Sequence, residues 1–417
     1  MSSFTIRLLK KGSGTSLPGW LVETYFPWIL HELDSRYSEV IYISGTNGKT
    51  TTRSVLVSYF KTKGVTICTN RGGANIMRGL AATLLLDQKL LNTKPKSKVL
   101  ILEVEEATLP KITVCIQPTT LILTNIFRDQ LDAYGEIDNT LDFFRSTLAL
   151  CDPNKTQLVI NADDYKLHSC ATDFAGKIIG FSVDEPNSNY EQDEKSVCLR
   201  FDRVFTATIC DNCLSVDFDT TTKLAMNLPG RYNVYNLLAA AVVGSQRFGL
   251  DGIEKVFNEI QPAFGRGEKI QLGDSHIELL LIKNPAGFNE VIDYIKTQSE
   301  KLDNDFGIVF IVNDNIADGR DVSWLWDVDI EKLKSSQHLQ KTYTSGGRGL
   351  DMLLRLEYAG FDVRPKNYIS EFSRVIHKID CSNKKHWFVL STYTGLLAFR
   401  KELGKSVKLV DISSDGN

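Results

Sequence analysis

The ten residues ISGTNGKTTT, at positions 43–52, constrain the fold of this chain more than any other stretch. An apolar run at 39–44 predicts a buried strand, and a helical pattern follows the loop. Backbone N–H groups in a glycine-rich turn at the start of a helix bind oxyanions. We therefore expect a strand, a phosphate-binding loop and a helix in succession. The residues expected around the phosphate are Gly45, Thr46, Asn47, Gly48, Lys49, Thr50 and Thr51.

Two side chains of this loop suit a nucleoside triphosphate. Lys49 can reach the β- and γ-phosphates, and the hydroxyl of Thr50 can bind Mg²⁺. The strict Walker pattern has a glycine five residues before Gly48, where this chain has Ile43, so the loop is the shorter GTxGKT form. A plain glycine turn with a surface lysine is the alternative. The coincidence of strand, loop, Lys-Thr pair and helix favours phosphate binding.

The first part of the chain has further short apolar runs, with helical patterns between several of them. This alternation predicts a mainly parallel α/β sheet. Residues 196–219 instead alternate polar and apolar side chains, which is typical of antiparallel hairpins. A strong helical pattern then extends from Tyr232 to about Phe248. The apolar runs of the expected parallel sheet lie at 98–104, 119–125, 157–163 and 177–183.

A second α/β set follows a stretch that reads as a linker. This stretch, 261–270, contains a proline and two glycines, and a third glycine follows at position 273. A chain of 417 residues is also too long for one ordinary core. We therefore predict two α/β domains, 1–265 and 266–417. The expected strands of the second domain lie at 277–283, 307–314 and 386–392, with helices between them.

Carboxylates and amides stand where the expected strands end. Glu103, Glu105 and Glu106 lie at the end of one strand, at the edge where a parallel sheet binds its ligand. A carboxylate such as Glu103 could hold Mg²⁺ opposite Thr50; a solvated acidic strand end is the alternative. Residues 124–136 place more polar groups after the next strand, with a helix cap and an exposed turn as the alternative.

Asn233 and Asn236 lie one turn apart at the start of a helix, on one face. Helix capping explains one of these amides, whereas a nucleotide base or ribose would use both. The segment 312–331 gathers several aspartates and two tryptophans after an expected strand. An acidic turn is its alternative interpretation.

Several classes of function are disfavoured by composition. A net charge of −3 without a basic stripe argues against nucleic acid. No apolar stretch reaches the roughly 20 residues of a spanning helix, and the N-terminus has no long apolar region, so we expect neither a transmembrane segment nor a secretory signal. The eight cysteines are scattered, which suggests reduced core thiols. A structural zinc site needs four ligands, and we see only Cys198, Cys210 and Cys213 close together.

Three of these stretches together resemble the Mur ligase superfamily, the ATP-dependent ligases of peptidoglycan and polyglutamate synthesis. They are GTNGKTTT, GRYNVYNLLAA (230–240) and FGRGE (264–268). The resemblance implies a Mur ligase-type ATPase domain with a mainly parallel sheet, followed by a Rossmann-like C-terminal α/β domain. It also implies that Asn233 and Asn236 lie beside adenine, and that Arg266 belongs to the nucleotide site.

One branch is matched more closely, over about residues 7–400. The stretches NRGGANIMRG, KNPAGFNEV, DGRDVSWLWDVDIE and TSGGRGLDMLLRLEYAG are similar to those of the MurT family. Its members are the synthetase subunits of lipid II isoglutaminyl synthase. The resemblance implies phosphorylation by ATP, with Mg²⁺, of the α-carboxylate of D-glutamate in the lipid II stem peptide. Ammonia from a GatD-type glutaminase, the partner in a heterodimer, would then give D-isoglutamine. The family's essential aspartate is carried to Asp327, with Asp321 next.

Departures from the family patterns refine this expectation. MurT proteins carry a zinc ribbon of four cysteines, whereas the region near 185–220 here is a reduced β insertion, so we predict no intact zinc site. Other Mur ligases carry a carbamylated lysine where the stretch from Gly135 to Asn154 has none, which favours amidation. The phosphate loop begins at residue 45, so we expect no nucleotide-sugar-binding domain before it. A lipid-linked substrate at the inner face of the cytoplasmic membrane fits better.

Two other functions stay open. The first is an amino-acid-adding Mur-type ligase similar to folylpolyglutamate synthase, although the missing lysine and NPAGFNEV count against it. The second is a nucleotide-binding subunit that no longer turns over, an alternative that the reduced insertion leaves open. ATP consumption that depends on an acceptor would exclude the second.

Overall fold

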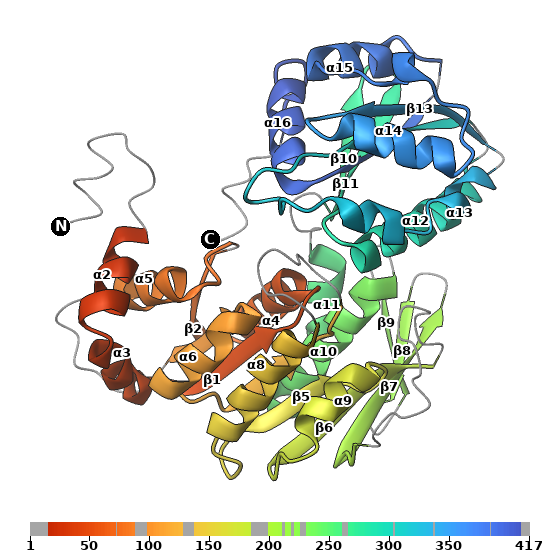
Figure 1. Ribbon diagram of the computed structural model, residues 1–417. Coiled ribbons are helices and arrows are strands. Elements are labelled where there is room, and N and C mark those ends of the chain that lie inside the picture. Colours follow the sequence, from red (N-terminus) through yellow and green to blue (C-terminus); the bar gives the residue numbers. More distant parts are fainter. Residues whose placement is uncertain are drawn as a thin grey trace.

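A computed structural model gives the fold of this chain as two bodies, each built on its own sheet (Figure 1). The N-terminal part of the chain forms the lower body in this view and the C-terminal part the upper one. The structure describes residues 16–71, 73–87, 98–127, 137–184, 199–210, 213–217, 221–225, 231–260, 266–302, 305–336, 338–383 and 385–409.

The first sheet has the strand order β2-β3-β1-β4-β5-β6-β7-β8-β9. Strands from β2 through β7 pair in parallel, and β7, β8 and β9 pair antiparallel. The expected parallel sheet and the expected hairpin are therefore both present. The strands are β1 (Tyr37–Ser44), β2 (Thr66–Thr69), β3 (Lys98–Glu103), β4 (Thr120–Leu123), β5 (Gln157–Asn161), β6 (Lys177–Val183), β7 (Arg203–Cys210), β8 (Cys213–Asp217) and β9 (Thr221–Ala225).

Helices cover both faces of this sheet, which is why its central strands read as continuous apolar runs. Ile43 of β1 packs toward one layer and Tyr42 toward the other, and both are fully buried. One layer contains α4 (Lys49–Thr62), α10 (Arg231–Phe248) and α11 (Ile253–Glu259). The other contains α2 (Ser16–Tyr25), α3 (Trp28–Leu33), α5 (Met77–Asp87), α6 (Leu109–Cys115), α8 (Ile137–Leu150) and α9 (Tyr165–Ala171).

The second sheet has the order β10-β11-β14-β12-β13. Only the β10–β11 pair is antiparallel among its described pairs. Its strands are β10 (Arg266–Leu272), β11 (Ser275–Leu281), β12 (Phe306–Ile311), β13 (Leu339–Ser345) and β14 (His386–Ser391). One face packs on α12 (Pro285–Ser299), α13 (Glu331–Lys334) and α14 (Gly349–Tyr358), and the other on α15 (Phe372–Asp380) and α16 (Tyr393–Leu403).

The prediction of a linker through residue 270 is wrong from residue 266 onward. Those residues form β10, whose Ile270 is buried and pairs with Ile277 of β11. The proposed domain boundary, after residue 265, adjoins residues 261–265, which lie outside the described residues, and it stays a prediction. The RGEKIQL sequence is mostly polar because β10 is an edge strand, and this hides it from a hydrophobic pattern.

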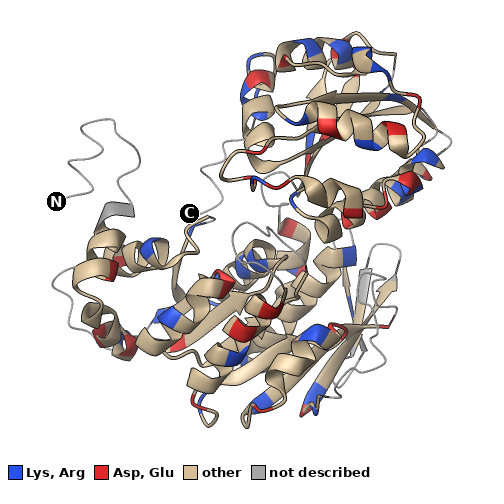
Figure 2. Cartoon of the chain, in the orientation of Figure 1, with Lys and Arg blue, Asp and Glu red and all other residues tan. Residues whose placement is uncertain are grey.

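Within the described helices, none has both the length and the apolar composition needed to cross a bilayer. Figure 2 shows basic and acidic residues mixed over both bodies rather than gathered by sign.

Candidate active site

The loop between β1 and α4 needs both of its glycines. Gly45 and Gly48 have φ of 127° and 89°, a region that side chains rarely adopt. A Cβ on Gly48 would lie 2.0 Å from Oδ1 of Asn236, and one on Gly45 would lie 2.3 Å from Oγ1 of Thr124. The loop is therefore packed against β4 on one side and α10 on the other.

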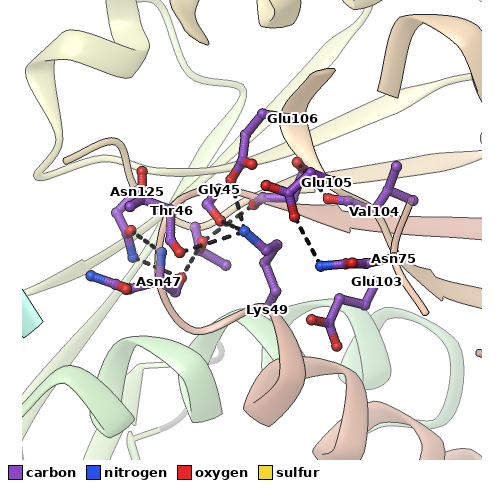
Figure 3. Close-up of polar contacts among 12 residues, drawn as sticks. Gly45, Thr46, Asn47, Lys49, Asn75, Glu103, Val104, Glu105, Glu106 and Asn125 are labelled. Atoms are coloured by element: carbon purple, nitrogen blue, oxygen red, sulfur yellow. Dashed lines mark hydrogen bonds and ion pairs between the residues drawn. The ribbon is translucent and has the colours of Figure 1, made fainter. Parts of the chain in front are cut away.

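The end of β4 holds the loop in place, as the close-up in Figure 3 shows. The backbone N–H of Thr46 donates to the carbonyl oxygen of Asn125 at 3.0 Å. The N–H of Asn47 donates to Oδ1 of Asn125 at 2.8 Å, and Nδ2 of Asn125 donates back to the carbonyl of Asn47 at 3.1 Å. Asn125 thus fixes the loop from the segment directly after β4, at the sheet edge where the sequence pattern had placed it.

Lys49 is buried and bound to a carboxylate. Its Nζ lies 2.8 Å from Oε1 of Glu106 and 2.6 Å from the carbonyl oxygen of Gly45. Burial alone would lower the pKa of Lys49, but Glu106 and its acidic neighbours outweigh it and raise that pKa. Burial raises the pKa of Glu106, although Lys49 opposes this. A phosphate would meet a lysine that is already oriented and fully charged.

Glu103 and Thr50 fit a small divalent cation. Oγ1 of Thr50 donates to Oε1 of Glu103 at 3.0 Å. Oε2 of Glu103 is buried, has no hydrogen-bond partner among the described residues and lies 3.4 Å from Nε of Arg53. Mg²⁺ typically binds one or two carboxylates together with substrate phosphates and water. This pair is therefore a suitable place for Mg²⁺. Glu105 instead accepts a hydrogen bond from Asn75 at 2.9 Å.

A cavity opens beside the loop, between the two bodies. Its walls include Asn47 and Gly48 from the loop, Tyr235 and Asn236 from α10, and apolar atoms of Leu280. The other residues that line it are Asn125, Phe127, Tyr232, Leu281, Lys283, Ala286, Gly287, Glu290 and Val291. A mostly apolar cavity with a few amides next to a phosphate loop suits a nucleotide base.

The two asparagines of α10 differ in their position relative to the cavity. Asn236 lines the cavity, and its Nδ2 donates to Oδ1 of Asn233 at 3.3 Å. Asn233 is buried and is not among the described residues that line the cavity. Tyr235 anchors the helix by donating from its hydroxyl to Oδ2 of Asp163 at 2.8 Å. The structure thus brings Asn236 to the cavity and places Asn233 behind it.

The second body touches the loop through the turn that joins β11 to α12. Nζ of Lys283 lies 3.3 Å from the carbonyl oxygen of Thr46. Nδ2 of Asn284 lies 3.4 Å from Oδ1 of Asn47. Sequence reasoning did not single out Lys283 or Asn284, although both lie in the IKNPAGFNEV segment that it noted. Their sequence separation from the loop is 237 residues.

Arg266 has a described backbone, at the start of β10, but its side chain lies outside what the structure describes. Its neighbour Glu268 has a packing role, because its carboxylate accepts from Nε of Arg400 at 3.0 Å and from Nη2 at 2.9 Å. That ion pair ties β10 to α16. The assignment of Arg266 to the nucleotide site stays a prediction.

The two candidate aspartates lie around the short 3-10 helix η3 (Ser323–Asp327). Asp321 accepts from the backbone N–H and the hydroxyl of Ser323, both at 2.8 Å. Asp327 is exposed at the end of η3. Neither is among the described residues that line the cavity. The segment rests on α12, because the N–H of Asp329 donates to Oδ1 of Asn289 at 2.9 Å.

The cysteines follow the expectation in part. Cys68, Cys151 and Cys170 are free and buried, and burial raises the pKa of each. Cys381, in contrast, is exposed. Cys198 lies outside the described residues, as do the side chains of Cys210 and Cys213, whose backbones pair across the β7–β8 turn. The described residues contain no cluster of metal-ligand type, and the absence of zinc stays a prediction.

Comparison with known proteins defines the class first. Residues 43–244 match the family model of the Mur ligase middle domain. MurF from Acinetobacter baumannii superposes with a TM-score of 0.65 at 16% identity, covering 94% of this chain and 80% of that one. MurF from Thermotoga maritima, in complex with ADP, gives 0.63 at 15% identity, covering 95% and 85%. The chain has the Mur ligase fold.

The second body narrows the family. Residues 281–396 match the family model of the MurT ligase C-terminal region. A Streptococcus pneumoniae protein, the MurT subunit of lipid II isoglutaminyl synthase (glutamine-hydrolyzing), is 30% identical over 95% of this chain and 94% of its own length. A Staphylococcus aureus protein of the same description is 30% identical over 84% of each chain. This chain belongs to the MurT family of Mur ligases, which confirms the sequence-based expectation.

Proposed function

We propose that this chain amidates the α-carboxylate of D-glutamate in the stem peptide of lipid II. The reaction uses ATP and passes through an acyl phosphate. The observation that supports this proposal most is that a phosphate loop and a MurT-type domain share one cavity. A phosphate loop with a charged, buried Lys49 opens into a cavity whose opposite wall belongs to a MurT-type domain. The named relatives are subunits of a glutamine-hydrolysing enzyme, so a GatD-type glutaminase is the proposed source of ammonia.

The chemistry assigns a task to each part of the site. A carboxylate is a poor electrophile, and phosphorylation gives it a leaving group. One carboxylate oxygen forms a bond to the γ-phosphorus as ADP leaves, and ammonia then displaces inorganic phosphate from the acyl carbon. Lys49 and the N-terminus of α4 hold the phosphoryl oxygens. Mg²⁺ between Thr50 and Glu103 would neutralise phosphate charge.

The cavity supports a proposed position for the nucleotide. We place adenine against Tyr235 and Asn236, with Asn233 orienting the amide of Asn236 through their hydrogen bond. Since lipid II is anchored in the inner leaflet, the chain would act at the cytoplasmic membrane face. The alternative hypothesis, an amino-acid-adding ligase, gains no specific support, because the similarity to other Mur ligase structures shows the fold alone.

Asp327 is the proposed residue for taking a proton from ammonia, with Asp321 as the alternative. Both carboxylate oxygens of Asp321 accept hydrogen bonds from Ser323, and Asp327 is exposed at the end of η3. Asp327→Asn is expected to lower amidation by about a hundredfold while ATP binding is kept. Asp321→Asn is the matched comparison. Normal turnover in both variants would remove the assignment.

Reconstitution tests the function directly. The protein is incubated with ATP, Mg²⁺ and lipid II, and is supplied either with ammonium or with a glutaminase partner and glutamine. Mass spectrometry should show conversion of one carboxylic acid to a carboxamide, with release of ADP in step. An added residue mass when amino acids are supplied, and no amidation, would instead identify an amino-acid-adding ligase.

A further inference from the structure

Two lysines from different bodies approach one peptide oxygen. Nζ of Lys283 lies 3.3 Å from the carbonyl oxygen of Thr46, and Nζ of Lys49 lies 3.5 Å from the same atom. The two ammonium groups are therefore no more than about 7 Å apart, a distance at which like charges repel appreciably in a protein interior. Glu106, whose Oε1 lies 2.8 Å from Nζ of Lys49, offsets part of this repulsion, and a phosphate near both ammonium groups would offset more of it.

The backbone holds Lys283 firmly at this place. On one side, the N–H of buried Ile282 donates to the carbonyl of Ser391 at 2.9 Å. On the other side, Asn284 caps α12 by accepting from the N–H of Gly287 at 2.8 Å. Lys283 therefore projects from a fixed turn rather than from a loose loop. Little conformational freedom of the backbone would be lost on binding a ligand.

The same wall carries the positive end of a helix. Helix α12 has 15 residues, and its first turn, with Ala286 and Gly287, lines the cavity. Helix α4 begins at Lys49 on the opposite side. Because helix N-termini favour anions, the starts of α4 and α12 and the two ammonium groups favour negative charge in this region of the cavity.

We propose that Lys283 is a ligand of the terminal phosphate of ATP, supplied by the second body across the cavity. This inference rests on the proposed function only for the identity of the nucleotide. ADP lacks the terminal phosphate, so Lys283 should distinguish ATP from ADP. The contact between Lys283 and the nucleotide would then form only while the terminal phosphate is still attached.

Binding of two probes tests this in the full chain with Mg²⁺. AMPPNP retains three phosphates and ADP has two. Lys283→Met is expected to weaken AMPPNP about tenfold or more and to change ADP less than about twofold, because a charge-assisted hydrogen bond to phosphate is lost only with AMPPNP. Lys283→Arg should recover part of the AMPPNP affinity. Lys296→Met, on α12 but absent from the described cavity lining, is the matched control and should change neither.

Two results would overturn the proposal: unchanged AMPPNP binding in Lys283→Met, or equal losses for AMPPNP and ADP. Equal losses would show that Lys283 supports the loop or the base rather than the terminal phosphate. Thermal unfolding of each variant separates a folding defect from a binding defect. The binding assay needs no lipid II, so a failed amidation assay with intact selectivity would refute the proposed reaction and leave Lys283 as a phosphate ligand.

Discussion

Two strand–turn–helix units of this chain have similar glycine-rich sequences, GTNGK between β1 and α4 and SGGRG between β13 and α14. In the second turn, N–H groups bind protein oxygens. Gly347 donates to Oδ1 of Asn313 at 2.9 Å, and Arg348 donates to the carbonyl of Val312 at 2.8 Å. In the first turn, no acceptor among the described residues takes the N–H of Gly48 or Lys49.

The basic side chains differ in the same way. Lys49 is about one-tenth exposed and faces the loop, whereas Arg348 is 39% exposed and pairs with Asp351 of its own helix at 3.2 Å. Glycine spacing alone therefore does not make an anion site. The decisive feature is whether neighbouring strand ends use the backbone donors of the turn or leave them for a ligand.

The largest expected effect contrasts the two basic residues. Lys49→Met should lower acceptor-dependent ATP turnover by about a hundredfold or more. The variant lacks the preorganised ammonium group that would stabilise the phosphoryl group during transfer. Arg348→Met should stay within about twofold, since its ion pair is partly exposed. ADP release with lipid II and ammonium measures both. Similar losses in the two variants would break the comparison and make the second turn a phosphate site as well.

A smaller effect concerns the metal. Glu103→Gln should raise the Mg²⁺ concentration for half-maximal turnover by about tenfold, because a neutral amide binds the cation less well than a carboxylate. Glu105→Gln is the control, since that side chain contacts Asn75 rather than Thr50. An unchanged Mg²⁺ requirement in Glu103→Gln, or an equal rise in the control, would show that Glu103 is not a ligand of Mg²⁺.

The last prediction concerns stability rather than turnover, and distinguishes the supports of the two turns. Buried Asp164 accepts from the N–H of Ile126, beside Asn125, at 2.7 Å, and burial raises its pKa from 3.8 to about 6. A raised pKa in the folded state gives stability that is present below about pH 4 and lost as pH rises to 6. The loss amounts to about 3 kcal/mol. Asn313, which accepts a hydrogen bond from the second turn, has an amide side chain that does not titrate over this pH range.

Asp164→Asn therefore should gain stability relative to the unmodified protein as pH rises from about 4 to 6. Thermal unfolding at several pH values follows this difference. A constant difference over that range would show that Asp164 does not titrate as its burial implies.

The sequence predicted the central strands because they are buried on both faces. Ile41, Ile101 and Ile122 belong to strands with continuous apolar runs, which a parallel sheet between two helix layers requires. It missed β10 and β13, which are the edge strands of the second sheet and expose polar side chains. It predicted the antiparallel β7–β8 pair from alternation.

Within the site, local spacing predicted the loop, and strand-end logic predicted that Glu103 lies beside Thr50. The pairing of Lys49 with Glu106 rather than Glu103 or Glu105 was not predictable, because three acids share one short segment. Asn125 belonged to the polar stretch 124–136, in which nothing in the sequence favoured one residue over the others. Its double hydrogen bond with the loop is a matter of orientation, which no spacing gives.

By itself, the sequence determined the loop, the two α/β sets and the family, because glycine turns and buried strands leave local patterns. Only the tertiary structure decided which donors remain for a ligand and which residues from the second body meet the loop. Lys283 and Thr46 are 237 residues apart, so their contact depends on how two separate sheets pack. Hydrogen bonds act over about 3 Å in space and leave no mark at such separations in sequence.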